Sequence, residues 1–295
     1  MPVPFSYDKA FDRNIGWLTV AEQQALRGRR VAIAGCGGVG GVHLLTLTRL
    51  GIGAFTLADH DVFELANFNR QAGATMASLG RSKVEVMAAF AREINPELDL
   101  RVLDEGVTEQ NLDNFLVGAE LFVDGFDFHA LDIRRRAFAA AYARGIPAIT
   151  AGPIGLSAAY LIFRPGEMSF EQYFGMAACD APALAAAERQ AAMEQRFLNG
   201  LVPDPIFRTY LVEPERFDLK ARRAPSIGAS CQLCAGVVGI TAIKLLTGRG
   251  EVKAAPWHHH FDPFCNVYVC EKADCESSPS QVEFVSPCKV DRSTS

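Results

Sequence analysis

The chain has 295 residues, 49% of them hydrophobic, which is enough to bury a large core in one or two domains. Its formal net charge of -5 argues against a protein that binds nucleic acid through bulk charge, and the charged N-terminus predicts no targeting segment. The apolar block at 235–243 is about half as long as a membrane-spanning helix, so we expect no membrane partner, and eight scattered cysteines fit a reduced, cytoplasmic protein.

Strand-like and helix-like segments alternate through the first half of the chain. The spacing of apolar residues predicts strands at 30–35, 55–59, 98–104, 120–127 and 146–152. It predicts helices at 39–50, 83–94, 108–116 and 131–145. The last of these helices would carry a partly exposed run of arginines at 134–136. This alternation indicates a parallel sheet with helices on both faces.

The pattern changes near residue 150. The segment 157–166 predicts a strand in a more antiparallel region, and 257–270 predicts late strands. Between them, 166–226 is a long irregular excursion with one helix at 182–198, which we expect to be functional because long loops seldom persist without a role. A helix at 228–247 then returns to the core. The predicted fold class is α/β: a Rossmann-like, mostly parallel sheet with helices on both faces, extended by antiparallel strands and a long crossover excursion.

A glycine-rich turn joins the first predicted strand to the first predicted helix. Its glycines are Gly35, Gly37, Gly38 and Gly40. A strand, a glycine turn and a helix in this order predict a nucleotide site, because the bare helix N-terminus binds phosphate. Asp59 ends the second strand, where a carboxylate can accept hydrogen bonds from ribose hydroxyls. Asp61 is either a second acid of the site or a turn-forming residue.

Polar residues beyond Asp59 distinguish a triphosphate site from a dinucleotide site. These residues are Asn67, Arg70, Gln71 and Lys83. Arginine offers a rigid fork for phosphate oxygens and lysine a point charge. Asp127, after a later parallel strand, would face the same crevice and could hold Mg²⁺ against the phosphates. A nicotinamide-dependent oxidoreductase on the same fold is the alternative, but it leaves these cations unexplained.

Several motifs together resemble the ThiF/MoeB/HesA family, the bacterial relatives of ubiquitin-activating enzymes. The matching stretches are GCGGVGG (35–41), DHDVFELANFNRQ (59–71), GRSK (80–83), NP (95–96) and VDGFD (123–127). The N-terminal segment 11–33 is also similar, with Arg13 at the place of the family's arginine. The resemblance covers residues 10–165 and 226–248.

The resemblance implies an adenylyltransferase. Such an enzyme uses ATP and Mg²⁺ to activate a carboxylate as acyl-AMP, releases pyrophosphate, and works as a homodimer. The acceptor would be the C-terminus of a ubiquitin-like sulfur carrier or a peptide, with a tRNA carboxylate least expected. A non-catalytic subunit of a heterodimeric enzyme is a further alternative.

The implied domain organisation is a single adenylation domain over 1–275, followed by a loose tail at 276–295. Its parts would be an N-terminal helical arm at about 8–28, a nucleotide-binding core at 29–165, the crossover excursion at 166–226, and a core helix with late strands at 227–275.

The resemblance also implies a role for each matching residue. Asp59 would hold the ribose, and Asp127 would position Mg²⁺. The residues implied to hold the phosphates are Asn67, Arg70 and Lys83, with Gln71 beside them. Arg13 would reach the ATP of the partner subunit.

The chain departs from the family pattern at its cysteines. Many members hold a structural zinc with two Cys-x-x-Cys pairs, but Cys179 is the sole cysteine where the first pair is expected. Cys231 and Cys234 have metal-like spacing but fall at the start of a predicted helix. Because a tetrahedral thiolate site needs four converging sulfurs, we do not expect zinc. Cys179 is either a covalent acyl acceptor or a passive thiol, and the sequence shows no cation beside it.

Two further features depart from the pattern or find no partner. The family's usual Asp-Asn is here Asp127-Phe128, so a polar contact near the nucleotide is lost or moved. The histidines at 258–260 have no evident ligand partner, and we expect them on a partly exposed strand.

Overall fold

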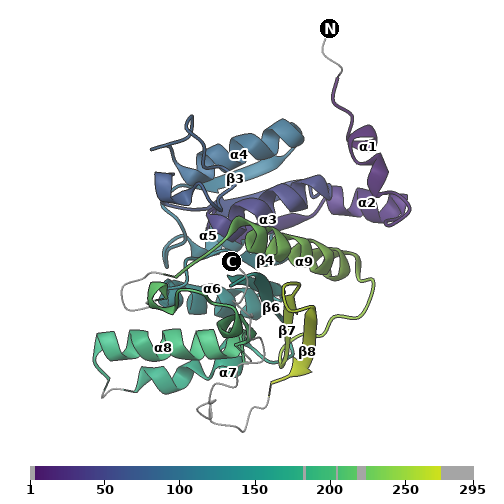
Figure 1. Ribbon diagram of the computed structural model, residues 1–295. Coiled ribbons are helices and arrows are strands. Elements are labelled where there is room, and N and C mark those ends of the chain that lie inside the picture. Colours follow the sequence, from purple (N-terminus) through teal and green to yellow (C-terminus); the bar gives the residue numbers. More distant parts are fainter. Residues whose placement is uncertain (1–3, 182–183, 204, 218–223, 274–295) are drawn as a thin grey trace.

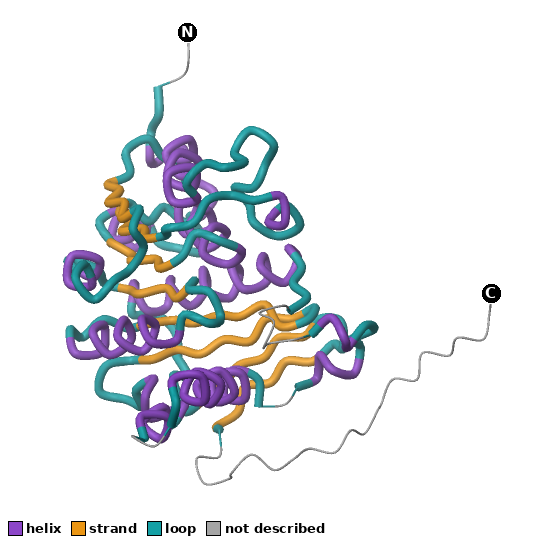
Figure 2. Tube along the Cα trace, turned by 90° about the vertical axis from the view of Figure 1, so that its left-hand side faces the viewer, coloured by secondary structure: helices purple, strands orange, loops and turns teal. Residues whose placement is uncertain are grey.

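A mixed sheet forms the centre of the molecule (Figures 1 and 2). The computed structural model describes residues 4–181, 184–203, 205–217 and 224–273. Within this part of the chain the sheet has eight strands in the order β3-β2-β1-β4-β5-β6-β7-β8. The strands are β1 (Arg30–Ala34), β2 (Ala54–Ala58), β3 (Asp99–Leu103), β4 (Leu121–Asp124), β5 (Ala148–Ile154), β6 (Ser157–Phe163), β7 (Trp257–Asp262) and β8 (Val267–Lys272). Strands β3 to β5 are parallel, and β5 to β8 pair antiparallel, which confirms the predicted fold class.

Helices cover both faces of the sheet. One face carries α3 (Gly38–Arg49), α4 (Lys83–Ile94) and α9 (Gly228–Thr247), joined by the N-terminal α1 (Tyr7–Ala10) and α2 (Val20–Arg27). The other carries α5 (Leu112–Leu116), α6 (Leu131–Ala143), α7 (Phe170–Phe174) and α8 (Ala186–Leu201). Short 3₁₀ helices lie at Asp12–Asn14, Leu65–Asn67, Met176–Asp180, Ile206–Thr209 and Pro214–Arg216.

The central strands are apolar along their whole length because both of their faces are covered. In β1, Val31 and Ile33 face the α3 and α9 side, while Ala32 and Ala34 face the α6 and α8 side. Helix α9 is long and apolar enough to cross a membrane, but half of it is buried in this structure, against α3 and the sheet. We therefore interpret it as a core helix.

The order of the strands fixes where a ligand can bind. The chain leaves β1 for β2 and β3 on one side, and β4 lies on the other side. In such sheets the crevice at the reversal point, outside the carboxyl ends of the strands, is the usual binding place. The turns after β1, β2 and β4 meet at this edge.

Some sequence predictions were wrong. The strand predicted at 120–127 ends at Asp124, and the helix predicted at 108–116 is only Leu112–Leu116. The histidines at 258–260 are all buried, because β7 is an interior strand between β6 and β8. Arg134 is buried rather than partly exposed, paired with Asp124. The tail predicted at 276–295 lies outside the described residues.

Candidate nucleotide site

Close packing explains two glycines of the turn after β1. Gly35 has φ +87°, and a Cβ there would overlap the carbonyl oxygen of Gly125 in the turn after β4. A Cβ on Gly40 would overlap the carbonyl oxygen of Gly35. Glycine therefore lets α3 begin directly against the ends of β1 and β4. The helix has Gly37 as its N-cap and no side-chain cap, so its first N–H groups remain available to an anion.

Asp59 ties the end of β2 to the glycine turn. Its Oδ2 accepts a hydrogen bond from the Cys36 N–H at 2.6 Å, and its Oδ1 accepts one from the Asp61 N–H at 2.8 Å. A carboxylate offers about four acceptor positions, so the buried Asp59 can still receive a ribose hydroxyl. Burial, with nearby Asp59, raises the pKa of the Cys36 thiol well above its usual value, and Lys83 opposes that rise. The predicted acid, Asp59, and the predicted cation, Lys83, thus both lie near enough to Cys36 to influence the pKa of its thiol.

Gln71 and Arg70 pack against the same turn. The Gln71 Nε2 lies 3.6 Å from the place of a Cβ on Gly37, and the Arg70 Cγ lies 3.7 Å from that of a Cβ on Gly38. The guanidinium of Arg70 donates to the Ala66 carbonyl and to Asn69 Oδ1, each at 3.0 Å.

The Gln71 side chain also leaves an acceptor unused. Its buried Oε1 has no hydrogen-bond partner among the described residues. A buried polar atom without a partner costs free energy, and a nucleotide hydroxyl or an ordered water would relieve that cost. The glycine cradle and this acceptor together fit a bound nucleotide.

Lys83 is buried at the start of α4 and makes an ion pair with Asp61. Its Nζ lies 2.8 Å from Asp61 Oδ2, and the lysine side chain is 9% exposed against 54% for the aspartate. Asp61 thus helps to orient the predicted cation Lys83, and its N–H also donates to Asp59 Oδ1 within the turn, so its role in the site stays a prediction. Asn67 is buried, and its Oδ1 accepts a hydrogen bond from the Glu64 N–H.

Asp127 lies in the loop after β4 and not at the strand end. Its side chain is exposed, and its Oδ1 accepts the His129 N–H at 3.0 Å. The strand-end acid is Asp124, which is buried and accepts from Arg134 Nε at 2.9 Å. No group of three or more candidate ligands that could hold a metal ion occurs within the described residues. One carboxylate suffices for Mg²⁺ when phosphates and water supply the other ligands, so Asp127 fits that ion.

Arg13 is separated from the glycine turn of its own chain. It is exposed on the 3₁₀ helix Asp12–Asn14. The neighbouring Asn14 contacts the Arg49 carbonyl at the C-terminal end of α3, whereas the glycine turn lies at the N-terminal end. A helix of 12 residues is about 18 Å long, so Arg13 and the turn lie at opposite ends of α3.

The cysteines of the described chain are buried or half-buried. Cys231 and Cys234 lie in α9, and the Cys231 Sγ packs 3.3 Å from the place of a Cβ on Gly38. Burial raises the pKa of the Cys231 thiol, and Arg70 opposes that rise. Cys179 is 1% exposed.

The residue next to Cys179 is paired with a cation from a distant part of the chain. Asp180 makes an ion pair with Arg135 at 2.7 Å. The arginine comes from α6, 45 positions away, and no local sequence pattern indicates the contact.

Sequence reasoning also missed the residues that hold the Asp127 loop. They are Arg134, His129 and two side chains of α8, Gln190 and Glu194. Contacts between the loop and α8 span about 65 positions of sequence, and no periodicity signals them.

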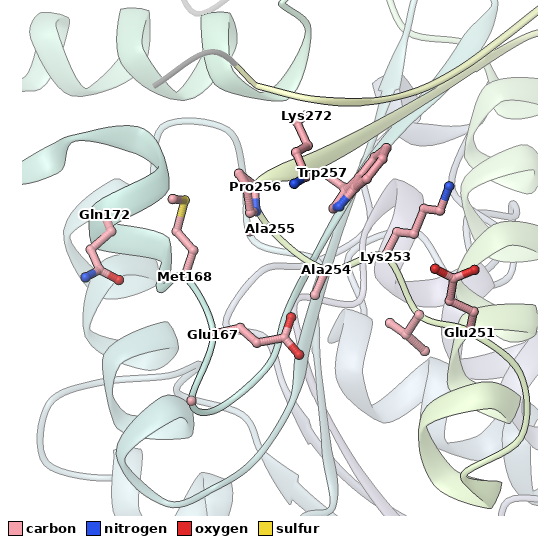
Figure 3. A pocket seen from close by; sticks show the side chains of 12 residues that line it. Glu167, Met168, Gln172, Glu251, Lys253, Ala254, Ala255, Pro256, Trp257 and Lys272 are labelled. Carbon is pink, nitrogen blue, oxygen red and sulfur yellow. The ribbon is translucent and has the colours of Figure 1, made fainter. Parts of the chain in front are cut away.

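A cavity of about 650 Å³ lies elsewhere, where β6 ends and β7 begins (Figure 3). Trp257 lines it, with the Lys253 Nζ 4.4 Å and the Lys272 Nζ 5.6 Å from its ring centre. Because β6 runs antiparallel to β5, this cavity is at the opposite edge of the sheet from the glycine turn. It contains none of the predicted site residues, so its volume does not locate the nucleotide site.

Residues 11–281 match the sequence profile of the ThiF family. The chain belongs to the ThiF family. It is 39% identical over 128 residues to the tRNA threonylcarbamoyladenosine dehydratase of Escherichia coli (strain K12), which covers 42% of this chain and 46% of the relative. It is 32% identical over 143 residues to the sulfur carrier protein ThiS adenylyltransferase of the same organism, covering 48% of this chain and 56% of the relative. The chain thus spans about half the length of these curated relatives.

A solved structure supports the same fold. The crystal structure of E. coli MccB with ATP is similar to this ThiF-family chain with a TM-score of 0.63, covering 92% of this chain and 74% of that chain. The sequence identity is 18%, so this likeness shows the fold alone. The family match confirms the resemblance drawn from the sequence motifs.

Proposed function

We propose that this ThiF-family chain is an ATP-dependent adenylyltransferase that activates a carboxylate as acyl-AMP and releases pyrophosphate. The observation that carries the proposal is the packing of Arg70 and Gln71 against the glycine turn. The aliphatic stem of Arg70 and the unused buried acceptor of Gln71 thereby flank the N-terminus of α3. A dinucleotide bound only through the helix end and a ribose acid needs neither group.

The proposed reaction balances without an external proton donor. A carboxylate oxygen of the acceptor attacks the α-phosphorus of ATP and forms a carboxyl-phosphate bond. The bond from the α-phosphorus to the bridging oxygen breaks, and pyrophosphate leaves with the electron pair. Charge grows on the phosphoryl oxygens and on the leaving group, where Arg70 and Lys83 would stabilise it. Asp127 would help to hold Mg²⁺, which supplies further positive charge to the phosphates when bound.

The acceptor is proposed to be the C-terminal carboxylate of a ubiquitin-like carrier protein or a peptide. A carboxylate borne by tRNA is the second candidate, because a relative that is 39% identical over 128 residues is a tRNA threonylcarbamoyladenosine dehydratase. The net charge of -5 favours the first candidate, since binding of tRNA depends on cationic surface.

We further propose a homodimer in which Arg13 acts on the site of the partner subunit. The position of Arg13 at the far end of α3 supports this arrangement, because it cannot reach the glycine turn of its own chain. Trp17, Val20 and Ile240 are also exposed, at 83%, 63% and 60%, on the arm and on α9, and α2 contacts α9. Exposed apolar side chains on neighbouring elements would fit an interface between subunits.

Exchange of labelled pyrophosphate into ATP tests the proposed activity. The purified chain is incubated with Mg²⁺, ATP and candidate acceptors: peptides that end in Gly-Gly, and total tRNA with or without ribonuclease. We expect exchange that depends on the peptide acceptor and falls about 100-fold in the Arg70→Ala variant. Exchange that ribonuclease abolishes would select the tRNA candidate. Tight binding of ATP and Mg²⁺ without any exchange would refute the activity.

A further inference from the structure

The loop that carries Asp127 is held by the excursion helix α8 through His129. The His129 N–H donates to Asp127 Oδ1 at 3.0 Å, and the His129 carbonyl accepts from Gln190 Nε2 at 3.0 Å. The His129 ring Nδ1 lies 2.7 Å from Glu194 Oε1, and Gln190 Nε2 donates to that same oxygen at 2.7 Å. Gln190 and Glu194 are one helical turn apart, so a single face of α8 makes these contacts.

Aromatic packing holds the same loop from the other side of His129. The Phe128 ring centre lies 5.7 Å from that of Phe197 on α8. The Arg134 guanidinium lies 4.6 Å from the Phe197 ring centre and donates to the carbonyls of Asp127 and Phe128. The backbone on both sides of the exposed carboxylate is therefore fixed.

Burial makes the polar contact specific. The side chains of His129 and Glu194 are 11% and 15% exposed, whereas Asp127 is exposed. A hydrogen-bonded polar group in a low-dielectric environment holds one geometry, because leaving it unpaired costs more there than in water. The exposed acid thus takes its orientation from a buried contact with α8.

We propose that Glu194 and Gln190 are positioning residues for the Mg²⁺ of the bound nucleotide. Through His129 they fix the Asp127 carboxylate so that its other oxygen, Oδ2, faces the metal. The inference rests on the proposed function, because it takes Asp127 as the ligand. It gives the excursion a defined role: α8 belongs to the nucleotide site and acts on the metal through the loop after β4.

Isothermal titration calorimetry tests this role without any turnover. ATP binding is measured with Mg²⁺ and with EDTA for the wild type, Glu194→Ala, Glu194→Gln and the control Gln195→Ala. Gln195 is exposed on the same helix and bonds to Asn199. In Glu194→Ala we expect the gain in ATP affinity from Mg²⁺ to fall about tenfold, as for other side chains that orient a metal ligand, with affinity in EDTA unchanged.

The two other variants separate positioning from folding. Glu194→Gln keeps an oxygen that accepts the His129 hydrogen bond, so it should retain most of the gain. If Glu194→Ala does not fold, Gln190→Ala removes only the contacts with the His129 carbonyl and with Glu194. It should lower the Mg²⁺ gain in the same direction.

Three results would overturn the inference. The first is a full Mg²⁺ gain in Glu194→Ala, and the second is an equal loss of affinity in EDTA, which would mean general damage to the site. The third is a wild type that gains no affinity from Mg²⁺, which would remove the assigned role of Asp127. Failure of the proposed activity is recognised separately, as an intact Mg²⁺ gain without pyrophosphate exchange.

Discussion

His43 lies on α3 in the core and should make the protein less stable in mild acid than at neutral pH. The side chain is fully buried, and neither ring nitrogen has a hydrogen-bond partner among the described residues. Burial disfavours the charged imidazolium and lowers the pKa of His43 from 6.5 to about 3. In the unfolded chain the same ring is solvated and takes up a proton near its ordinary pKa.

The sign and size of the effect follow from these pKa values. Between pH 6.5 and pH 3 the unfolded state binds a proton that the folded state does not, so the free energy of unfolding falls as the pH falls. With a folded pKa of about 3, the loss is roughly 2 kcal/mol at pH 5 and about 1.4 kcal/mol for each further unit, levelling off near pH 3. Well above pH 6.5 the titration of His43 no longer affects the free energy of unfolding.

The wild type and His43→Leu are each unfolded with urea at pH 7.5 and at pH 5. The comparison of their free energies of unfolding measures the contribution of His43. The leucine fills a similar volume and cannot titrate, so the difference between the two pH values should shrink by roughly 2 kcal/mol. The control is His60→Gln, because the His60 side chain is 76% exposed, and it should keep the wild-type difference. Other groups that titrate in this range contribute equally to each protein and cancel. An unchanged difference in His43→Leu would refute the reasoning.

The other predictions concern the nucleotide site and one exposed position of α9. Arg70→Ala should lower pyrophosphate exchange by about 100-fold, as expected for the loss of one preorganised donor, and an unchanged rate would exclude Arg70 from the site. Gly40→Ala forces a Cβ onto a carbonyl oxygen of the glycine turn and should abolish ATP binding in calorimetry. Gly236→Ala, on an open face of α9, should instead raise the unfolding free energy by about 0.5–1 kcal/mol. Refolding Arg13→Ala together with Asp127→Ala at equal ratio should restore about a quarter of wild-type exchange, because the mixed dimer has one complete site; no recovery would show that Arg13 does not act across the interface.

The sequence alone predicted the alternation of elements and the position of the glycine turn. These features depend on local interactions: the apolar period within β1 and α3, and the need for glycine where Gly35 has positive φ. Arg70 and Lys83 could be placed near that turn because parallel strand ends share one edge. The structure brings both residues to the turn, while their roles toward phosphate remain predictions.

Other features could not be predicted because they depend on contacts between distant parts of the chain. The arginines at 134–136 had the composition of a surface, yet Arg134 is buried against Asp124. The histidines at 258–260 have the polar composition of an exposed strand, but β7 lies inside the sheet, and the His259 ring stacks on Tyr160 at 4.5 Å. The burial of a residue depends on which strand or helix packs against it, and the local sequence around the residue does not identify that neighbour.

The difference between the features that the sequence predicted and those that only the structure showed therefore has a physical cause. Steric and periodic constraints act over a few residues, so the sequence by itself determined the α/β class, the bare end of α3 and the set of groups suited to a nucleoside triphosphate. The tertiary structure alone decided that Arg13 lies far from its own turn and that Glu194 holds the loop of Asp127. Those arrangements depend on strand order and helix packing, which are settled only when the whole chain buries its apolar surface.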